Sequence, residues 1–138
     1  MKSQEALRAI FSYLCSTDSP EPLLINCTAG KDRTGIVIMV LMLLAGASAE
    51  DVAKEYHRSE EGLGPDWKTT TIERMIMDPS FAGQDRRAVE RLVGAREEVM
   101  MDVIAMIEKE WGGIEGFVRE EMKVSDWVLH KSKGALRA

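Results

Sequence analysis

The sequence contains few of the residues that build disulfide-bonded or metal-binding domains. Its 138 residues include only two cysteines and two histidines. Two cysteines cannot supply the dense disulfide framework of a small secreted domain, and a thiolate chemistry would require a reducing compartment. His57 and His130 have no cysteine or carboxylate partners at metal-ligand spacing. We therefore expect ordinary helix histidines, no metal site and no cofactor.

A long apolar run and an excess of positive charge are also missing. The longest apolar stretch, residues 36–45, is about ten residues long, roughly half of what a membrane-spanning helix needs. The first residues are not followed by the apolar segment of a secretion signal. A net charge of -5 argues against a surface for nucleic acid or anionic membranes. These absences predict a cytoplasmic protein with no nucleic-acid partner and no stable membrane insertion.

The composition that remains is typical of one soluble globular domain over residues 1–138. Hydrophobic residues make up 45% and charged residues 30% of the chain, which is long enough for a hydrophobic core. The nine methionines are expected to fill that core. There are no internal repeats and no low-complexity segments.

Turn formers divide the chain into segments whose apolar residues recur at helical spacing. The short apolar run 23–26 is the exception and predicts a buried strand. We expect Gly46 to end the helix that follows this strand, and Ser48 with Asp51 to begin the next one. The predicted helices cover residues 3–15, 34–45, 49–60, 67–77, 84–110 with a break near Gly94, 113–122 and 125–133.

The stretch from Leu23 to Gly35 carries the chemistry of the chain. An apolar run leads to Cys27, a glycine-bearing loop follows, and an apolar helix begins at Thr34. Backbone N–H groups of such a loop converge on one point, and the positive end of the helix adds to the field. A cysteine there would be held as the nucleophilic thiolate, and Arg33 offers a two-pronged donor for phosphate oxygens. The pattern indicates attack by sulfur on a phosphomonoester.

The string Cys-Thr-Ala-Gly-Lys-Asp-Arg-Thr-Gly, residues 27–35, resembles the signature loop of the cysteine-dependent protein tyrosine and dual-specificity phosphatases. It is similar to the subgroup that contains fungal tyrosine phosphatases and the secreted mycobacterial tyrosine/lipid phosphatase. Residues 97–122 and 125–129 resemble the closing helices of the family more loosely. The resemblance implies an α/β fold with a strand–loop–helix phosphate-binding core and a largely helical remainder at about 84–133.

The resemblance also implies a role for each residue of the loop 27–34. Cys27 would be the nucleophile, and Arg33 would hold phosphoryl oxygens and stabilise the transition-state charge. Asp32 would protonate the leaving group, with Asp18 as the alternative acid; otherwise Asp32 only pairs with a cation or orders the loop. The residues expected to bind phosphate, mainly through backbone N–H groups, are Thr28, Ala29, Gly30, Lys31, Asp32, Arg33 and Thr34.

Three side chains in and near the loop each have two interpretations. Lys31 would favour highly charged phosphoinositide head groups, as in related lipid phosphatases, or would be a solvated lysine. Thr34 would donate a hydrogen bond to the sulfur of Cys27, cap the helix, or do both. Cys15 would be a buried helix residue, or would protect the nucleophile as a disulfide under oxidation.

Two features depart from the pattern of this family. Asn26 stands where the family usually has a histidine that helps to hold the loop, so a weaker pKa shift is expected at Cys27. Only about 22 residues precede the predicted strand, whereas the family carries several parallel strands there, and one strand cannot make a sheet. We expect the sheet to be completed by another chain, by pairing or strand exchange in a homo-oligomer, unless the chain is a fragment.

The sequence therefore predicts a protein tyrosine phosphatase-like hydrolase with a phosphocysteine intermediate. Its substrate would be a phosphorylated protein, a phosphoinositide or a small phosphate ester. The alternative is a degenerate module that binds phosphorylated ligands, or a protein partner, without turnover. A third possibility, an anion site that handles sulfur or arsenate, is disfavoured by the full loop motif.

Overall fold

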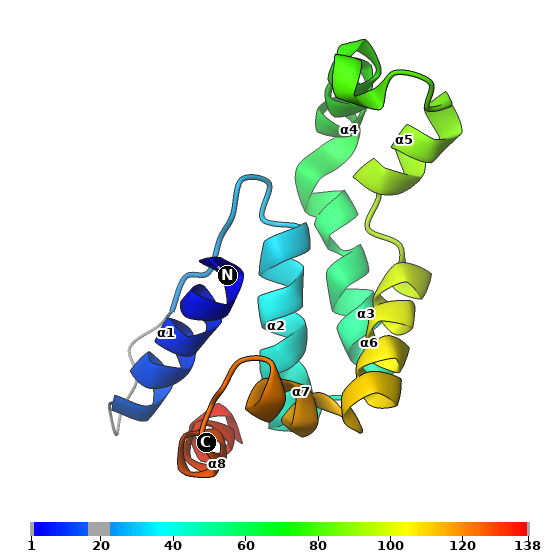
Figure 1. The fold of residues 1–138 in the computed structure, drawn as a ribbon. Coiled ribbons are helices and arrows are strands. Elements are labelled where there is room, and N and C mark those ends of the chain that lie inside the picture. The colour runs from blue at the N-terminus through cyan, green and yellow to red at the C-terminus, as the bar shows by residue number, and fades with distance from the viewer. Residues whose placement is uncertain (1, 17–22, 138) are drawn as a thin grey trace.

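The computed structural model describes residues 2–16 and 23–137, and in these two ranges the regular structure is entirely helical (Figure 1). The elements in chain order are α1 (Lys2–Ser16), α2 (Asp32–Ala45), α3 (Ala49–His57), α4 (Ser59–Met77), the 3-10 turn η1 (Pro79–Phe81), α5 (Arg86–Val93), α6 (Glu97–Trp111), α7 (Ile114–Glu120) and α8 (Asp126–Arg137).

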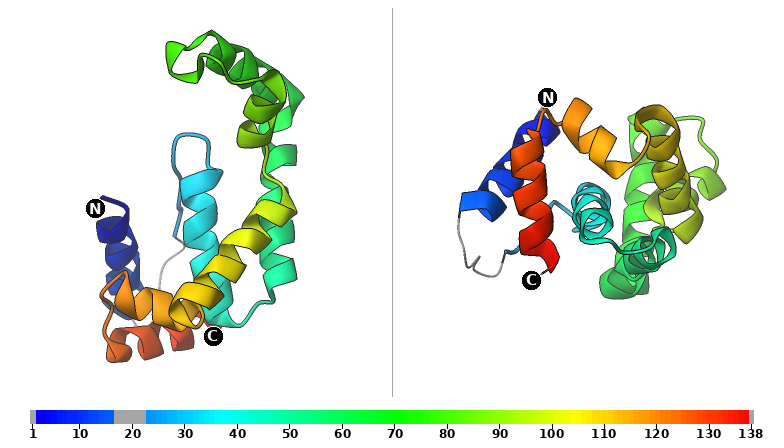
Figure 2. Two further views of the ribbon diagram at one scale, coloured as in Figure 1. Left: turned by 45° about the vertical axis from the view of Figure 1, so that its right-hand side comes forward. Right: turned by 90° about the horizontal axis from the view of Figure 1, so that it is seen from below.

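Helix α2 lies at the centre of the molecule, with α1 and α8 on one side and α3 and α6 on the other (Figure 2). Its sequence is apolar almost all round, which suits a helix that is covered from several directions. The side chains that are fully buried around it come from α1, α2, α3 and the C-terminal helices. Those of the main core include Phe11, Met39, Val40, Leu44, Val52, Val118 and Met122.

The helix boundaries follow from local capping chemistry. Gly46 takes the left-handed conformation (φ 100°) and donates its N–H to the carbonyl of Leu43 at 3.1 Å, which ends α2 as predicted. Ser48 Oγ accepts the N–H of Asp51 at 3.1 Å, which confirms the predicted start of α3. The predicted break near Gly94 is also present, because α5 ends at Val93 and α6 begins at Glu97.

The chain between α3 and α6 forms an arm that projects from the body (Figures 1 and 2). We define the arm as residues 65–93. The break predicted between the helices 49–60 and 67–77 is present as a kink inside α4 at Gly64, whose φ of 72° and ψ of 164° are not helical. The arm has a small hydrophobic cluster of its own, in which Trp67 and Met75 pack on the buried side chains of Ile72, Val89 and Val93.

The prediction of a buried strand at 23–26 is wrong for this structure. The segment has no regular secondary structure, and the side chain of Leu24 is 89% exposed. A strand needs a neighbour to receive its N–H and C=O groups, and the described residues supply no strand that could pair with it. The α/β core and the sheet completed by another chain are therefore not confirmed.

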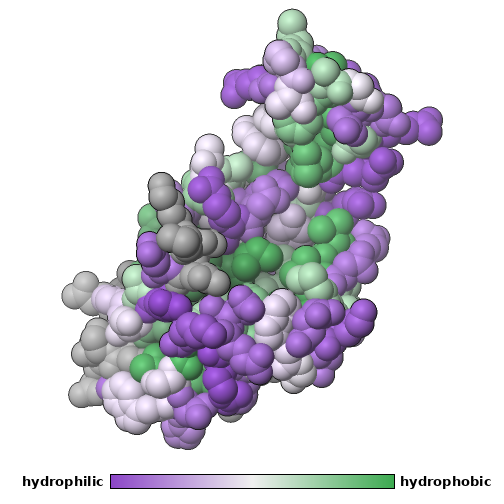
Figure 3. Space-filling view, viewed as in Figure 1, coloured by the Kyte–Doolittle hydropathy of each residue, from purple (hydrophilic) through white to green (hydrophobic). Residues whose placement is uncertain are grey.

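Apolar and polar side chains are unevenly distributed on the surface. Figure 3 shows apolar side chains in the middle of one face and along the arm, surrounded by hydrophilic ones. Ile76, Met77 and Leu92 are the exposed large apolar residues of the arm. None of the helices in the described ranges is both long enough and apolar enough to cross a membrane.

Candidate active site

The predicted signature loop connects the extended segment 23–26 to the N-terminus of α2. The loop turns at Gly30, whose φ of 67° favours glycine, although a Cβ there would meet no atom within 4 Å. Glycine is therefore required by backbone conformation and not by lack of space. The N–H of Gly35 then donates to the carbonyl of Lys31 at 2.6 Å, which begins the hydrogen-bonding pattern of α2. This layout leaves the first N–H groups of α2 facing the loop.

Cys27 lies at the start of this loop, and its thiol is strongly acidified. The pKa of Cys27 falls from an ordinary 9.0 to about 6, chiefly because the Thr34 side chain donates toward the sulfur. Backbone N–H groups of Thr34, Ala29 and Gly30 act in the same direction, whereas partial burial opposes them. At neutral pH the sulfur is therefore mainly thiolate, with Asn26 in place of the usual histidine.

The Thr34 hydroxyl is the group that lowers the pKa of Cys27 most. Its oxygen is buried and has no hydrogen-bond partner among the described residues. A buried hydroxyl without a partner is costly, so this one is poised to donate when the sulfur is charged. The helix-cap role suggested for Thr34 is not observed, because α2 has no side-chain cap hydrogen bond at its N-terminus. The contact between Thr34 and the sulfur stays a prediction.

Arg33, near the end of the loop, contacts a residue near its start. Its Nη2 donates to the Thr28 hydroxyl at 2.8 Å, and the guanidinium is exposed. This contact holds the arginine over the loop residues that precede it, and the remaining N–H groups stay available to an anion.

Lys31 does not lie in solvent at the mouth of the loop. Its side chain is only 3% exposed, and its ammonium donates to Asp32 Oδ1 at 2.5 Å and to the carbonyl of Gly94 at 3.1 Å. The solvated lysine offered as one interpretation is therefore wrong, because the side chain is buried and its ammonium is bound to the protein. The ammonium also lies 6.0 Å from the centre of the Tyr56 ring.

Asp32 is held from α3 as well as from the loop. The Tyr56 hydroxyl donates to Asp32 Oδ1 at 3.3 Å, while the carboxylate itself remains 68% exposed. Burial first, and then the charge of Asp32, raise the pKa of Tyr56 to about 12. Asp32 thus does pair with a cation and order the loop, and its exposure leaves it accessible to a substrate.

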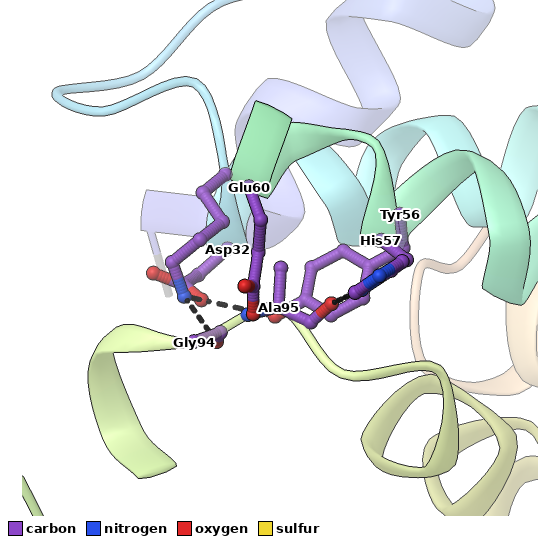
Figure 4. Close-up of polar contacts among 7 residues, drawn as sticks. Asp32, Tyr56, His57, Glu60, Gly94 and Ala95 are labelled. Carbon is purple, nitrogen blue, oxygen red and sulfur yellow. Dashed lines mark hydrogen bonds and ion pairs between the residues drawn. The ribbon is translucent and has the colours of Figure 1, made fainter. Parts of the chain in front are cut away.

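The turn between α5 and α6 is fixed to the same region, as Figure 4 shows. Glu60 Oε1 accepts the N–H of Ala95 at 2.6 Å, and His57 Nδ1 lies 2.8 Å from the carbonyl of Ala95. Lys68 forms an ion pair with Glu60 at 3.0 Å and holds the pKa of that carboxyl below its usual range. These side chains, with Tyr56, were missed by sequence reasoning. Tyr56, His57 and Glu60 had no local signal, because their contacts with Asp32 and Ala95 join residues far apart in the chain.

An apolar groove of about 640 Å³ opens beside the thiol. One wall is the segment 23–26, and the others are the apolar faces of α1 and α2. Its lining includes Leu7, Ile10, Leu24, Ile36, Val37, Cys27 and Arg33.

Two of the predicted residues cannot be placed. Asp18, the alternative acid, lies outside the described residues, and so does the side chain of Cys15. Within the described ranges, no three histidine, cysteine, aspartate or glutamate side chains come together as metal ligands would.

The sequence profile of the tyrosine phosphatase family matches residues 1–138. The chain belongs to this family. The resemblance drawn from the loop motif is thereby confirmed at the level of the superfamily.

Two curated relatives agree with this assignment. The triple specificity protein phosphatase PtpB of Mycobacterium tuberculosis is 25% identical over 142 residues, which cover 97% of this chain and 49% of the relative. A protein of Cupriavidus necator, provisionally named a tyrosine-protein phosphatase, is 24% identical over 116 residues, covering 84% of this chain and 41% of the relative. The chain therefore spans less than half the length of both family members.

Proposed function

We propose that this chain is a cysteine-dependent phosphomonoester hydrolase of the tyrosine phosphatase family. The observation that carries the proposal is the position of Cys27 at the start of a loop that leads into α2, with Arg33 held over that loop by the Thr28 hydroxyl at 2.8 Å. The loop N–H groups and Thr34 lower the pKa of Cys27 to about 6. A structural cysteine has no need of such an environment, whereas a nucleophile at neutral pH does.

The reaction follows from the groups around that sulfur. The thiolate of Cys27 attacks phosphorus, while Arg33 and the loop N–H groups hold the three equatorial oxygens as their charge spreads. Asp32 supplies a proton to the leaving oxygen, and its exposure allows it to approach that oxygen. Water then attacks the phosphocysteine and releases phosphate, with no metal or cofactor required.

The substrate is a phosphate ester on a protein, on a phosphoinositide or on a small molecule. Lys31 does not extend a charge toward the mouth of the loop, so its position gives no support for selection of multiply phosphorylated head groups. The degenerate, binding-only alternative is also without support, because the acidified thiol is what turnover requires.

The first test is phosphate release from an aryl phosphate in the presence of a chelator, with Cys27→Ser as the comparison. We expect turnover in the wild type that is unaffected by the chelator and falls by at least about 10³-fold in the variant. Turnover that persists in Cys27→Ser would contradict the mechanism. Phosphate binding without any turnover would favour the binding module.

A further inference from the structure

Lys31, Asp32 and Tyr56 form a polar cluster beside the loop. The proposed reaction gives a role to Asp32 but none to the side chains of Lys31 and Tyr56. Lys31 Nζ and the Tyr56 hydroxyl donate to the same carboxylate oxygen, Asp32 Oδ1, at 2.5 Å and 3.3 Å. No described residue donates to the second oxygen, Oδ2. The two oxygens of Asp32 are therefore unlike: one is bound on the protein side, and the other is free on an exposed side chain.

Packing fixes both donors. The Tyr56 side chain is nearly buried, and its ring lies against Gly35, where a Cβ would come within 2.9 Å of Tyr56 Cδ2. The Lys31 ammonium is anchored on the carbonyl of Gly94, in the turn between α5 and α6. Three elements, α2, α3 and the α5–α6 turn, thus determine where Asp32 Oδ1 lies.

We propose that Tyr56 and Lys31 are positioning residues that bind Asp32 by Oδ1 and leave Oδ2 as the oxygen that transfers the proton. This inference rests on the proposed function. As the S–P bond forms and the bond from phosphorus to the leaving oxygen breaks, the proton on Oδ2 passes to that oxygen. In the second step water loses a proton to Oδ2 and attacks phosphorus, and the S–P bond breaks to restore the thiolate of Cys27.

The charges around Asp32 are consistent with one bound and one free carboxylate oxygen. Lys31 from the loop and Tyr56 from α3 contact Asp32 directly. Glu60, on α4, acts on Tyr56 through its charge and is itself balanced by Lys68, with His57 nearby. The charge of Lys31 is consequently engaged inside the protein, which makes it a positioning residue and not a binding residue for a head group.

Tyr56→Phe is the most direct test by steady-state kinetics, because it keeps the ring against Gly35 and removes only the hydroxyl. We expect kcat for an aryl phosphate to fall roughly tenfold, a part of the 10²–10⁴ that a general acid contributes. KM should stay within about twofold, because the hydroxyl of Tyr56 contacts Asp32 and not the substrate. Tyr13→Phe, the other tyrosine, is the matched control. An unchanged kcat in Tyr56→Phe, or a loss confined to KM, would overturn the proposal.

Lys31→Met separates positioning from binding. We expect kcat to fall for a simple aryl phosphate and for a multiply phosphorylated inositol alike. A rise in KM confined to the inositol phosphate, with kcat retained, would show that Lys31 binds substrate and would overturn its positioning role.

The contact between Tyr56 and Asp32 can also be measured without turnover. In a rapid pH jump followed at 295 nm, we expect Asp32→Asn to lower the pKa of Tyr56 from about 12 part of the way toward 10.0, because the charge of Asp32 is lost. Tyr56→Phe identifies the signal. An unchanged midpoint would overturn the proposal. If the wild-type chain shows no turnover, the proposed function fails, and this titration still decides whether Tyr56 holds Asp32.

Discussion

At the scale of the residue, the loop 27–34 shows how one short sequence acidifies a thiol. The acidifying groups are all local: the hydroxyl of Thr34 and the N–H groups of Ala29, Gly30 and Thr34. None of them carries a formal charge, so the effect depends on geometry that the loop and the start of α2 impose. This is why an acidified thiol at Cys27 could be predicted from the spacing of the loop residues.

The first residue-scale prediction concerns Thr34→Val, which keeps the shape of the side chain and removes its hydroxyl. We expect the pKa of Cys27 to rise from about 6 toward 9.0, because the largest acidifying group is lost. The rate of thiol alkylation by iodoacetamide, measured against pH in a Cys15→Ala background, gives this pKa. The thiolate fraction at neutral pH should fall about tenfold for each unit by which the pKa exceeds 7.

Thr28→Val provides the comparison for that experiment. It also removes a hydroxyl from the loop, but that hydroxyl pairs with Arg33 and not with Cys27. We expect the pKa of Cys27 to stay near 6 in this variant. Equal shifts in the two variants would mean that loss of loop order, and not loss of the donor from Thr34, controls the thiol.

A second residue-scale prediction concerns Arg33→Lys. A lysine keeps the charge but loses the planar fork that can hold two phosphoryl oxygens at once. We expect kcat/KM for an aryl phosphate to fall by about 10²–10³-fold, similar to the loss of one oxyanion donor. Steady-state kinetics measure this, and circular dichroism checks that the helices are retained. A fall of less than about threefold would show that the loop N–H groups suffice.

The residues of the site that could not be predicted are those whose contacts join distant parts of the sequence. Tyr56, His57 and Glu60 reach the loop or the turn at Gly94 only because α3, α4 and the α5–α6 turn are packed together. Hydrophobic spacing places such residues on a helix, but it does not say which distant backbone group they will meet. The enclosed position of Lys31 was unpredictable for the same reason.

At the scale of the element, the helix ends were predicted more accurately than the interruptions between them. Gly46 ends α2 and Ser48 begins α3 through local capping, so both helix ends could be predicted from the sequence. The break predicted at 62–66 is limited to a kink at Gly64, because Pro65 falls within the first turn after that kink, where its missing N–H costs little. The strand predicted at 23–26 is absent because a strand depends on a partner that the described residues do not contain.

Two helical glycines allow a matched test of element packing. A Cβ at Gly116 in α7 would lie 1.9 Å from the carbonyl oxygen of Trp111, whereas one at Gly134 in α8 would meet nothing within 4 Å. We expect Gly116→Ala to lower the free energy of unfolding by about 2–3 kcal/mol, because α7 must move away from α6.

Gly134→Ala should instead raise that free energy by about 0.5 kcal/mol, through reduced backbone entropy of the unfolded chain. Urea denaturation of both variants measures the two changes under the same conditions. The packing of α7 on α6 would be in doubt if Gly116→Ala proved as stable as the wild type.

At the scale of the whole molecule, the main departure from expectation is the absence of a sheet from the described ranges. What remains is a helical body around α2 with an extended segment, 23–26, at its edge and an apolar groove beside that segment. Family members extend well beyond the length matched here, since this chain covers 41% and 49% of the two relatives.

The exposed segment 23–26 leads to a prediction about dimerisation. Leu23 and Leu24 are exposed, at 43% and 89%, next to backbone groups that no described strand pairs. We propose that two copies of the chain pair at this edge, because unpaired extended backbone with apolar side chains is a template for a second strand. Sedimentation velocity over a range of concentrations should detect a dimer.

Leu24→Asp is the variant for that measurement, because an 89% exposed side chain can be changed without disturbing the core. We expect it to shift the protein toward monomer. Met77→Asp, at another exposed apolar residue on the distant arm, is the control and should leave the association unchanged. A wild-type chain that stays monomeric at every concentration would contradict the proposal.

The separate hydrophobic cluster of the arm has a consequence for the dynamics of the protein. Ile72, Val89 and Val93 do not join the main core, so little of the stability of the body is transmitted to residues 65–93. Native-state hydrogen exchange should therefore divide the amides into two cooperative units, with those of the arm opening at a lower free energy than those of α2. The polar contacts at Gly94 and Ala95 mark the boundary between the two units, close behind the residues that hold Asp32.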